Sequence, residues 1–243
     1  MIKFSFQKIK FISFKDHEFK NIINKMGLFL FPAAPALASI EDKKRYFISL
    51  KKADFVFLDS SFFVILLRIF KNLKVIRFSG YKFLKLFFRY LKKNKKTSIF
   101  LIDPDIDKSK NNYKFIKKIG LKQKNINSYI APFYNFKSIK DKNLLIKIKK
   151  YKPNIILINI GGGTQEILGL YLKNNINHKC KIICTGAAIS FFTKDQFPIN
   201  DFIDQYYLGW FVRSIYSPFT FPKRLFYALK LVKIVLKSKI TIV

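Results

Sequence analysis

The sequence predicts an α/β fold, a Rossmann-like and mostly parallel sheet with helices on both faces. Apolar runs of strand type recur along the chain and read as continuous rather than alternating, which suits parallel strands covered on both faces. The predicted strands are residues 28–31, 53–58, 98–102, 154–160 and 181–185. Segments with helical spacing separate them, which is typical of βαβ units. A chain of 243 residues is long enough for one such domain with a small appendage.

The first residues predict an exception to the parallel pattern. Residues 2–14 alternate apolar and polar side chains, as expected for a hairpin at a sheet edge. The segments between the strands are then assigned by their spacing and by turn residues such as Gly27, Gly80 and the prolines of 32–35. The expected helices are residues 16–25, 36–52, 62–70, 81–93, 111–119, 140–151 and 164–174. Residues 74–78 are expected to be extended, and the stretch from 120 to 136 has no clear pattern.

The strongest local signal is the end of the strand at 154–160. It leads directly into Gly161, Gly162 and Gly163, followed by Gln165 and Glu166. Glycines let the backbone approach a ligand closely, and the N-terminus of the next helix favours a negative group such as a diphosphate. The segment is neither Gly-x-Gly-x-x-Gly nor a P-loop, so an ordinary strand-to-helix turn remains the alternative.

The charge of the chain predicts an anionic partner. Lys and Arg number 47 against 14 acidic residues, a formal charge of +33. Nucleic acid, anionic lipid and a phosphorylated substrate all fit this charge, and composition does not choose among them. Part of the excess is also explained by a general richness in Lys, Ile, Asn and Phe.

Cysteine usage and hydropathy indicate a cytoplasmic protein that does not cross a membrane, and they are compatible with one that binds to a membrane surface. Cys180 and Cys184 are the only cysteines, and only two histidines could join them as metal ligands, so neither a zinc site nor a disulfide framework is expected. The two cysteines are expected to be buried thiols in a reducing compartment. Residues 1–10 lack the apolar core of a signal peptide. The longest apolar run, 55–67, is interrupted by Asp59 and is too short to span a bilayer.

Several residues at the strand ends and beyond occur in a recognisable order. They are Asp59; Arg77 with Gly80; Gly161, Gln165 and Glu166; Gly186 with Ala187; Pro198; Leu208, Trp210 and Arg213; and Pro218, Lys223 and Arg224. In that order they resemble the WecG/TagA/CpsF glycosyltransferase family (glycosyltransferase family 26) over residues 31–230. The resemblance implies transfer of an N-acetylhexosamine such as N-acetylmannosamine from UDP to a polyprenyl-diphosphate-linked sugar. The expected setting is the inner face of the cell membrane, in cell-surface polysaccharide or teichoic-acid biosynthesis.

The resemblance also assigns roles. Asp59 would be the general base that deprotonates the acceptor hydroxyl, and the Gln165 amide would hold the donor sugar or uracil. The remaining substrate-binding residues would be Arg77, Gly161, Gly162, Gly163, Glu166, Gly186, Ala187, Arg213, Lys223 and Arg224. The cations among them would neutralise the leaving UDP, so neither a metal nor another cofactor is expected.

Each assignment has a structural alternative. Asp59 could be a turn former, Gln165 an ordinary residue of a first helical turn, and Arg77 the partner of a surface carboxylate. Asp103-Pro104-Asp105 formally matches the Asp-x-Asp pattern of metal-dependent transferases.

Two other functions stay open at this point. The chain departs from the family pattern at several positions, so a catalytically weakened member is one alternative. These positions are residues 31–34, Asp59-Ser60, Gly163-Thr164, Ile189-Ser190 and Gly209. A basic nucleic-acid-binding protein is the other, although the aromatic residues are not interleaved with Arg and nucleic acid is not the favoured partner. A nucleotide-dependent oxidoreductase is disfavoured because no Gly-x-Gly-x-x-Gly follows any strand.

The C-terminal part predicts a separate role. Residues 1–205 would form the glycosyltransferase domain and residues 206–243 a basic appendage that associates with the membrane. On a helical wheel of residues 223–237, Lys223, Lys230, Lys233 and Lys237 form one stripe beside a broad apolar face. Such a helix either packs on the core or lies in the interface of an anionic membrane, and the lipid-borne acceptor favours the membrane. Whether the chain forms a homo-oligomer is left open.

Overall fold

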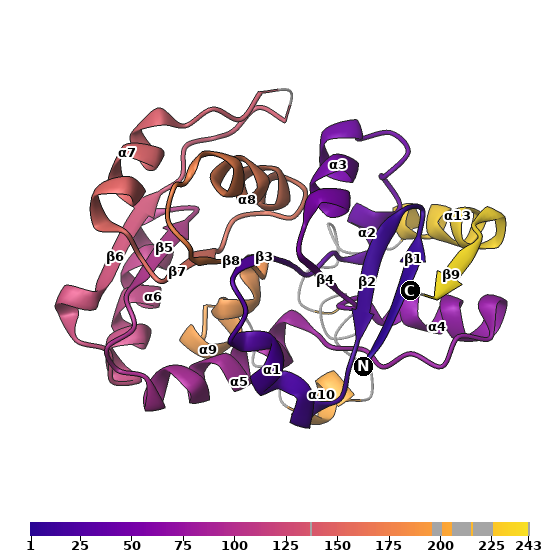
Figure 1. Cartoon of the computed structure of the whole chain (residues 1–243), viewed down its shortest axis with the longest axis horizontal. Coiled ribbons are helices and arrows are strands. Elements are labelled where there is room, and N and C mark those ends of the chain that lie inside the picture. The colour runs from indigo at the N-terminus through magenta and orange to yellow at the C-terminus, as the bar shows by residue number, and fades with distance from the viewer. Residues whose placement is uncertain (137, 196–200, 206–214, 216–225, 243) are drawn as a thin grey trace.

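The fold is an α/β arrangement around one twisted sheet (Figure 1). The computed structural model describes residues 1–136, 138–195, 201–205, 215 and 226–242. Nine strands of this described part form the sheet, in the order β6-β5-β7-β8-β3-β4-β2-β1-β9. Their bounds are β1 Ile2–Phe6, β2 Ile9–Ser13, β3 Gly27–Leu30, β4 Phe55–Phe57, β5 Ile99–Asp103, β6 Ile126–Ile130, β7 Ile155–Ile158, β8 Lys181–Cys184 and β9 Ile240–Ile242. The strands from β6 to β2 are parallel, and β1 is antiparallel to both β2 and β9.

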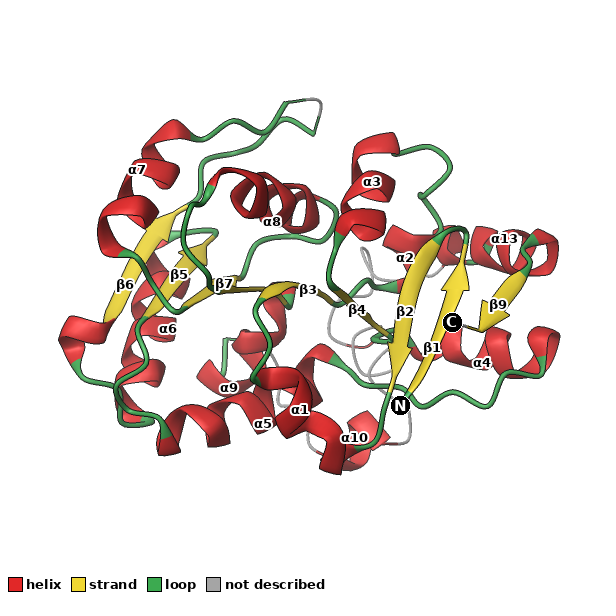
Figure 2. Ribbon diagram, viewed as in Figure 1, coloured by secondary structure: helices red, strands yellow, loops and turns green. Residues whose placement is uncertain are grey.

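Both faces of the sheet are covered, as the continuous apolar runs predict. In β5, Phe100 and Ile102 belong to one hydrophobic core, whereas Ile99 and Leu101 belong to the core on the opposite face. Helices lie on both faces of the sheet (Figure 2) and contribute to both cores. The first core is covered by α2 Ala34–Leu37, α3 Lys44–Lys52, α4 Ser61–Lys71, α7 Lys142–Tyr151, α8 Thr164–Asn175 and α13 Lys230–Lys237. The second is covered by α1 Phe19–Ile23, α5 Gly80–Lys93, α6 Ile106–Lys118 and α9 Ser190–Thr193.

The chain order creates a switch point near the middle of the sheet. From β3 the chain continues to β4 on one side, whereas β8 and then β7 lie on the other side of β3. In open α/β sheets, ligands bind outside the carboxyl ends of the strands at such a point. The carboxyl ends of β4, β7 and β8 are therefore the place to look for a site.

The described part of the tail packs on the sheet. Strand β9 pairs with β1, and α13 buries Leu231, Ile234 and Val235 in the first core. Of the two alternatives for the tail helix, packing on the core is thus observed for residues 226–242, and Lys223 lies outside the described residues.

The predicted thiols are present: Cys180 and Cys184 are both free and buried. Among the described helices, none has the length and apolar character needed to cross a bilayer.

Gly27 is the position where the fold depends most clearly on a missing side chain. Its φ is +128°, and an added Cβ would overlap the Asp54 carboxylate, with Asp54 Cγ only 2.7 Å away. That carboxylate accepts the Leu28 N–H at 2.7 Å and pairs with Lys173 at 2.7 Å, so it cannot easily move.

We expect Gly27→Ala to lower the free energy of unfolding by about 2–4 kcal/mol, because backbone strain and overpacking add. Gly120→Ala is the matched control, since Gly120 has a φ of +108° but its nearest neighbour would be Lys95 Cε at 3.5 Å. In the control, only backbone strain should lower the free energy of unfolding, by about 1–2 kcal/mol. Urea unfolding of both variants measures the difference, and equal losses would contradict the role of Asp54.

Candidate functional site

Three strand ends meet at the switch point. Asp59 follows β4, the three glycines follow β7, and Thr185 follows β8. The Asp59 Oδ1 accepts the Gly80 N–H at 2.8 Å, at the first residue of α5. A Cβ on Gly80 would lie 3.6 Å from the Cβ atoms of Thr185 and Ala188. The end of β4, the start of α5 and the end of β8 are therefore in contact.

Gln165 joins two of these strand ends. Its side chain is only 3% exposed, and its Oε1 accepts the Gly186 N–H at 2.7 Å. Its Nε2 donates to Glu166 Oε1 at 3.2 Å. The amide thus links the turn after β7 to the turn after β8, where Gly186 has a φ of +59°.

Glu166 lies beneath the glycine turn. It is 1% exposed, and its Oε2 accepts the Gly163 N–H at 2.6 Å, which fixes the start of α8. Burial raises the pKa of Glu166 to about 7, and the charge of Asp59 adds to the increase. The two carboxyl groups are therefore within electrostatic reach of each other. Burial also raises the pKa of Tyr46 on α3, and the charge of Glu166 adds to that increase.

The glycine turn presents bare backbone. Gly161 and Gly162 are exposed, and a Cβ on either would meet no described atom within 4 Å. Gly163 is different: its φ is +90°, and a Cβ there would lie 3.1 Å from the Phe136 ring. Gly163 is required by the turn, whereas the first two glycines leave space into which a ligand could come close.

Arg77 holds the backbone around Asp59. Its Nε donates to the Asp59 carbonyl at 2.7 Å, and its Nη1 pairs with Asp204 Oδ1 at 2.9 Å. Asp204 belongs to α10, Asp201–Gln205, and its Oδ2 accepts the Ser79 hydroxyl at 2.9 Å. Arg77 does have a carboxylate partner, as the structural alternative proposed, but this pair is largely buried at the edge of the site.

The other predicted residues fall into two groups. Ala187 is exposed beside Gly186. Arg213, Lys223 and Arg224 lie outside the described residues, as do Pro198, Leu208, Trp210 and Pro218. The prediction that these cations bind the donor stays a prediction.

Some residues and contacts of the site were not predicted from the sequence. Gly80 was expected as a turn residue and as part of the resemblance, but its N–H contact with Asp59 was not predicted, although Ser79 accepts the Lys82 N–H at 3.0 Å and marks the start of α5 as a helix cap. Thr185 was not predicted: its buried Oγ1 finds no partner in the described part of the chain. No signal in the sequence points to Asp204 or Tyr46, whose contacts arise only from tertiary packing.

The two carboxylates of the Asp-x-Asp pattern, Asp103 and Asp105, make different contacts within the fold. Asp103 is fully buried, and its Oδ1 accepts the side-chain amides of Asn112 and Asn159 at 2.7 Å each. Asp105 caps α6 through the Lys108 N–H at 2.8 Å and also pairs with the Lys108 ammonium. Within the described ranges, no three His, Cys, Asp or Glu side chains group in a way that could hold a metal ion.

The raised pKa of Glu166 predicts a pH dependence of stability. An unfolded chain loses this proton near 4.5, whereas the folded protein keeps it to about 7. The folded state binds more protons between these values, so the free energy of unfolding falls as the pH rises through this window, in total by about 3 kcal/mol.

Glu166→Gln should remove that dependence, because the amide keeps an acceptor for the Gly163 N–H but has no proton to lose. From about pH 5 to about pH 8, we expect the wild type to lose up to roughly 10 °C in Tm relative to the variant. Glu41→Gln, at an exposed position, is the control and should follow the wild type. A Glu166→Gln protein with the same pH slope as the wild type would contradict the assignment.

Comparison with known proteins identifies one family. The profile of the glycosyl transferase WecG/TagA/CpsF family matches residues 6–242, which is nearly the whole chain. No individual curated protein matches the chain.

Proposed function

Because the chain belongs to the WecG/TagA/CpsF family of glycosyltransferases, we propose that it transfers an N-acetylhexosamine, such as N-acetylmannosamine, from a UDP-sugar to a polyprenyl-diphosphate-linked acceptor. The observation that supports this best is the meeting of Asp59, the glycine turn and Gly186 at the carboxyl ends of β4, β7 and β8. The setting would be cell-surface polysaccharide or teichoic-acid biosynthesis, at the inner face of the cell membrane.

In this proposal Asp59 is the general base. The acceptor hydroxyl oxygen forms a bond to the anomeric carbon of the donor sugar, the bond from that carbon to the diphosphate oxygen breaks, and the hydroxyl proton passes to Asp59. The Gly80 N–H donates to the Asp59 carboxylate at 2.8 Å, and Arg77 donates a hydrogen bond to the backbone carbonyl of Asp59 at 2.7 Å. Together they hold the carboxylate in one position. Fixed geometry of this kind is what a catalytic base needs.

The donor diphosphate would lie on the glycine turn. Gly161 and Gly162 offer exposed backbone before the N-terminus of α8, where amide groups and the helix dipole favour negative charge. Arg77, Arg213, Lys223 and Arg224 would supply the positive charge that the departing UDP requires. Gln165 would act as a positioning residue, since its amide is already bound to Gly186 and Glu166. The proposal includes neither a metal nor another cofactor.

Binding of UDP tests this proposal against the nucleic-acid alternative, which the formal charge of +33 supports. At a UDP concentration about 100 times its Kd, ligand binding adds about 2.7 kcal/mol of stability. We therefore expect UDP to raise the Tm by roughly 5–10 °C. Single-stranded RNA at physiological salt should bind weakly, since phosphate-driven binding falls steeply with salt. Tight RNA binding together with no response to UDP would favour the alternative.

A further inference from the structure

The Asp204 carboxylate lies where an anionic ligand would bind at the start of α5. Its Oδ1 pairs with Arg77 Nη1 at 2.9 Å, and its Oδ2 accepts the Ser79 hydroxyl at 2.9 Å. A guanidinium, a hydroxyl and the N-terminus of a helix of 14 residues are groups that favour a phosphate. Asp204 therefore fills an anion site from within the chain.

This anion site borders the proposed general base. Arg77 Nε donates to the Asp59 carbonyl at 2.7 Å, so one guanidinium contacts both Asp59 and Asp204. Arg77 Nη1 also donates to the Asp204 carbonyl at 2.8 Å. An Nη atom carries two N–H groups, and Asp204 engages both of them. A diphosphate can therefore use Nη1 only if Asp204 gives up these bonds.

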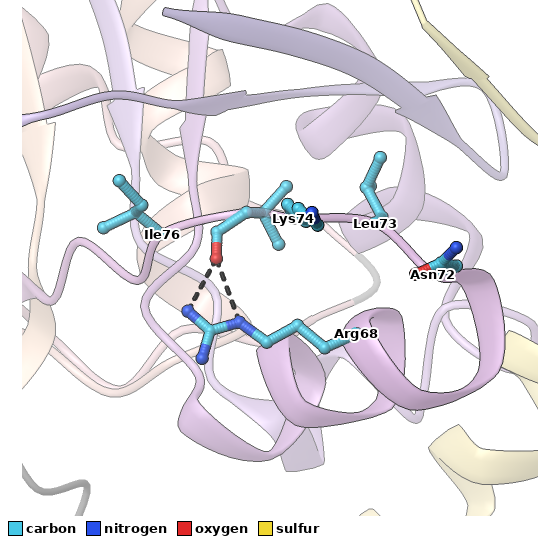
Figure 3. A pocket seen from close by; sticks show the side chains of 6 residues that line it. Arg68, Asn72, Leu73, Lys74 and Ile76 are labelled. Carbon is cyan, nitrogen blue, oxygen red and sulfur yellow. Dashed lines mark hydrogen bonds between the residues drawn. The ribbon is translucent and has the colours of Figure 1, made fainter.

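The backbone around Arg77 is held by bonds that do not involve α10. The Phe78 N–H donates to the Leu58 carbonyl at 3.0 Å. On the other side of Arg77, the Arg68 guanidinium donates to the Val75 carbonyl through Nε at 3.1 Å and Nη2 at 2.7 Å, beside a depression lined by residues 72–76 (Figure 3). Arg77 can thus exchange its partner by a movement of its side chain, while its backbone stays in place.

We propose that Asp204 is an internal competitor of the donor: its carboxylate holds Arg77 until the diphosphate of the UDP-sugar takes its place. This inference rests on the proposed function, which assigns the donor diphosphate to Arg77. The exchange leaves the largely buried guanidinium paired with an anion before and after donor binding, which avoids an uncompensated charge. A pair that is formed in about nine of ten molecules raises the apparent Kd of the donor about tenfold, because only the remaining molecules are ready to bind.

Calorimetric titration of Asp204→Asn with UDP tests the proposal. An asparagine keeps an oxygen for Arg77 and a polar group for Ser79, but it lacks the charge that competes with a phosphate. We expect the Kd for UDP to fall by roughly tenfold, while the Tm falls as well because an ion pair is lost. Asp204→Glu keeps the carboxylate and should bind UDP no more tightly than the wild type.

Asp201→Asn is the matched control. Asp201 lies on the same helix and pairs with the Lys85 ammonium, at a side chain 66% exposed. Its replacement changes the net charge by the same amount as Asp204→Asn but leaves the Arg77 pair intact. The Kd for UDP should therefore stay within about twofold of the wild type.

Hydrogen–deuterium exchange tests the same exchange of partners in the wild type, where no substitution can disturb the fold. Saturating UDP should increase deuterium uptake in residues 201–205, because Asp204 loses its bonds to Arg77. Uptake in these residues that is unchanged or lower with bound UDP would overturn the proposal.

The remaining outcomes separate this proposal from the proposed function. Weaker UDP binding by Asp204→Asn would make Asp204 a support for Arg77 instead of a competitor, and equally tight binding by Asp201→Asn would assign the effect to overall charge. Either result overturns the proposal. Inorganic pyrophosphate is the second probe: tighter pyrophosphate binding by Asp204→Asn with no binding of UDP refutes the proposed function and leaves the competition standing. A protein that binds neither probe in any variant overturns both.

Discussion

Replacement of Asp59 by Asn is expected to lower turnover by about 10²- to 10⁴-fold, the usual contribution of a positioned base. An asparagine has nearly the same shape and keeps an oxygen that can accept the Gly80 N–H, which lies 2.8 Å from the carboxylate. The fold and the affinity for UDP should therefore change little, while the group that accepts the proton is lost. Initial rates and calorimetric titration with UDP measure the two effects separately.

Asp107→Asn is the control for this change, because Asp107 is an exposed carboxylate in the first turn of α6. It should leave turnover within about twofold of the wild type, as surface substitutions usually do. An Asp59→Asn enzyme as active as the wild type would refute the role of Asp59 as base. A parallel loss of rate, UDP affinity and Tm would instead make Asp59 a residue that supports the structure.

Gln165→Ala is expected to weaken UDP-sugar binding and turnover together. The change removes the acceptor of the Gly186 N–H and the donor to Glu166, both in a buried region. Leaving such groups unpaired costs about 1–3 kcal/mol. If the turns after β7 and β8 separate as a result, the affinity for the donor should fall by roughly 5- to 150-fold. Steady-state kinetics with varied donor should show a higher KM and a lower kcat.

Gln165→Glu provides the comparison for this prediction. A glutamate keeps an acceptor for Gly186, but it places a second carboxyl group against Glu166, so the variant should recover more activity at low pH than at high pH. Wild-type UDP affinity in Gln165→Ala would show that the bridge between the two turns does not shape the donor site.

Much of the sheet could be predicted because its inner strands are apolar on both faces. β7 and β8 follow directly from their isoleucine-rich runs. β6 was missed, since it lies at the sheet edge and only Ile126 of its residues is buried. α6 begins at Ile106 rather than at 111 because Asp105 caps it.

One further helix differs from the prediction, because the segment expected as a single helix over 36–52 is divided into α2 and α3. The β-type run at the C-terminal end forms β9, which pairs with β1.

The site was predictable to the extent that it depends on strand ends. Asp59, Gly161 and Gly186 follow apolar strands, and parallel strands bring their carboxyl ends to one edge. The hydrogen bond from Gly186 to Gln165 and the ion pair of Arg77 with Asp204 could not be predicted, because the partners are far apart in the sequence. A helical wheel showed the amphipathic tail but could not show that its apolar side is filled by the core.

The most direct test of the account is a donor screen. Radiolabelled UDP-sugars are incubated with the enzyme and a polyprenyl-diphosphate-linked acceptor in anionic vesicles, and the lipid-linked product is extracted and counted. The account predicts transfer from at least one UDP-N-acetylhexosamine by the wild type, with a loss of about 10²-fold or more in Asp59→Asn. Absence of lipid-linked product with every UDP-sugar, or equal product from wild type and Asp59→Asn, would contradict it.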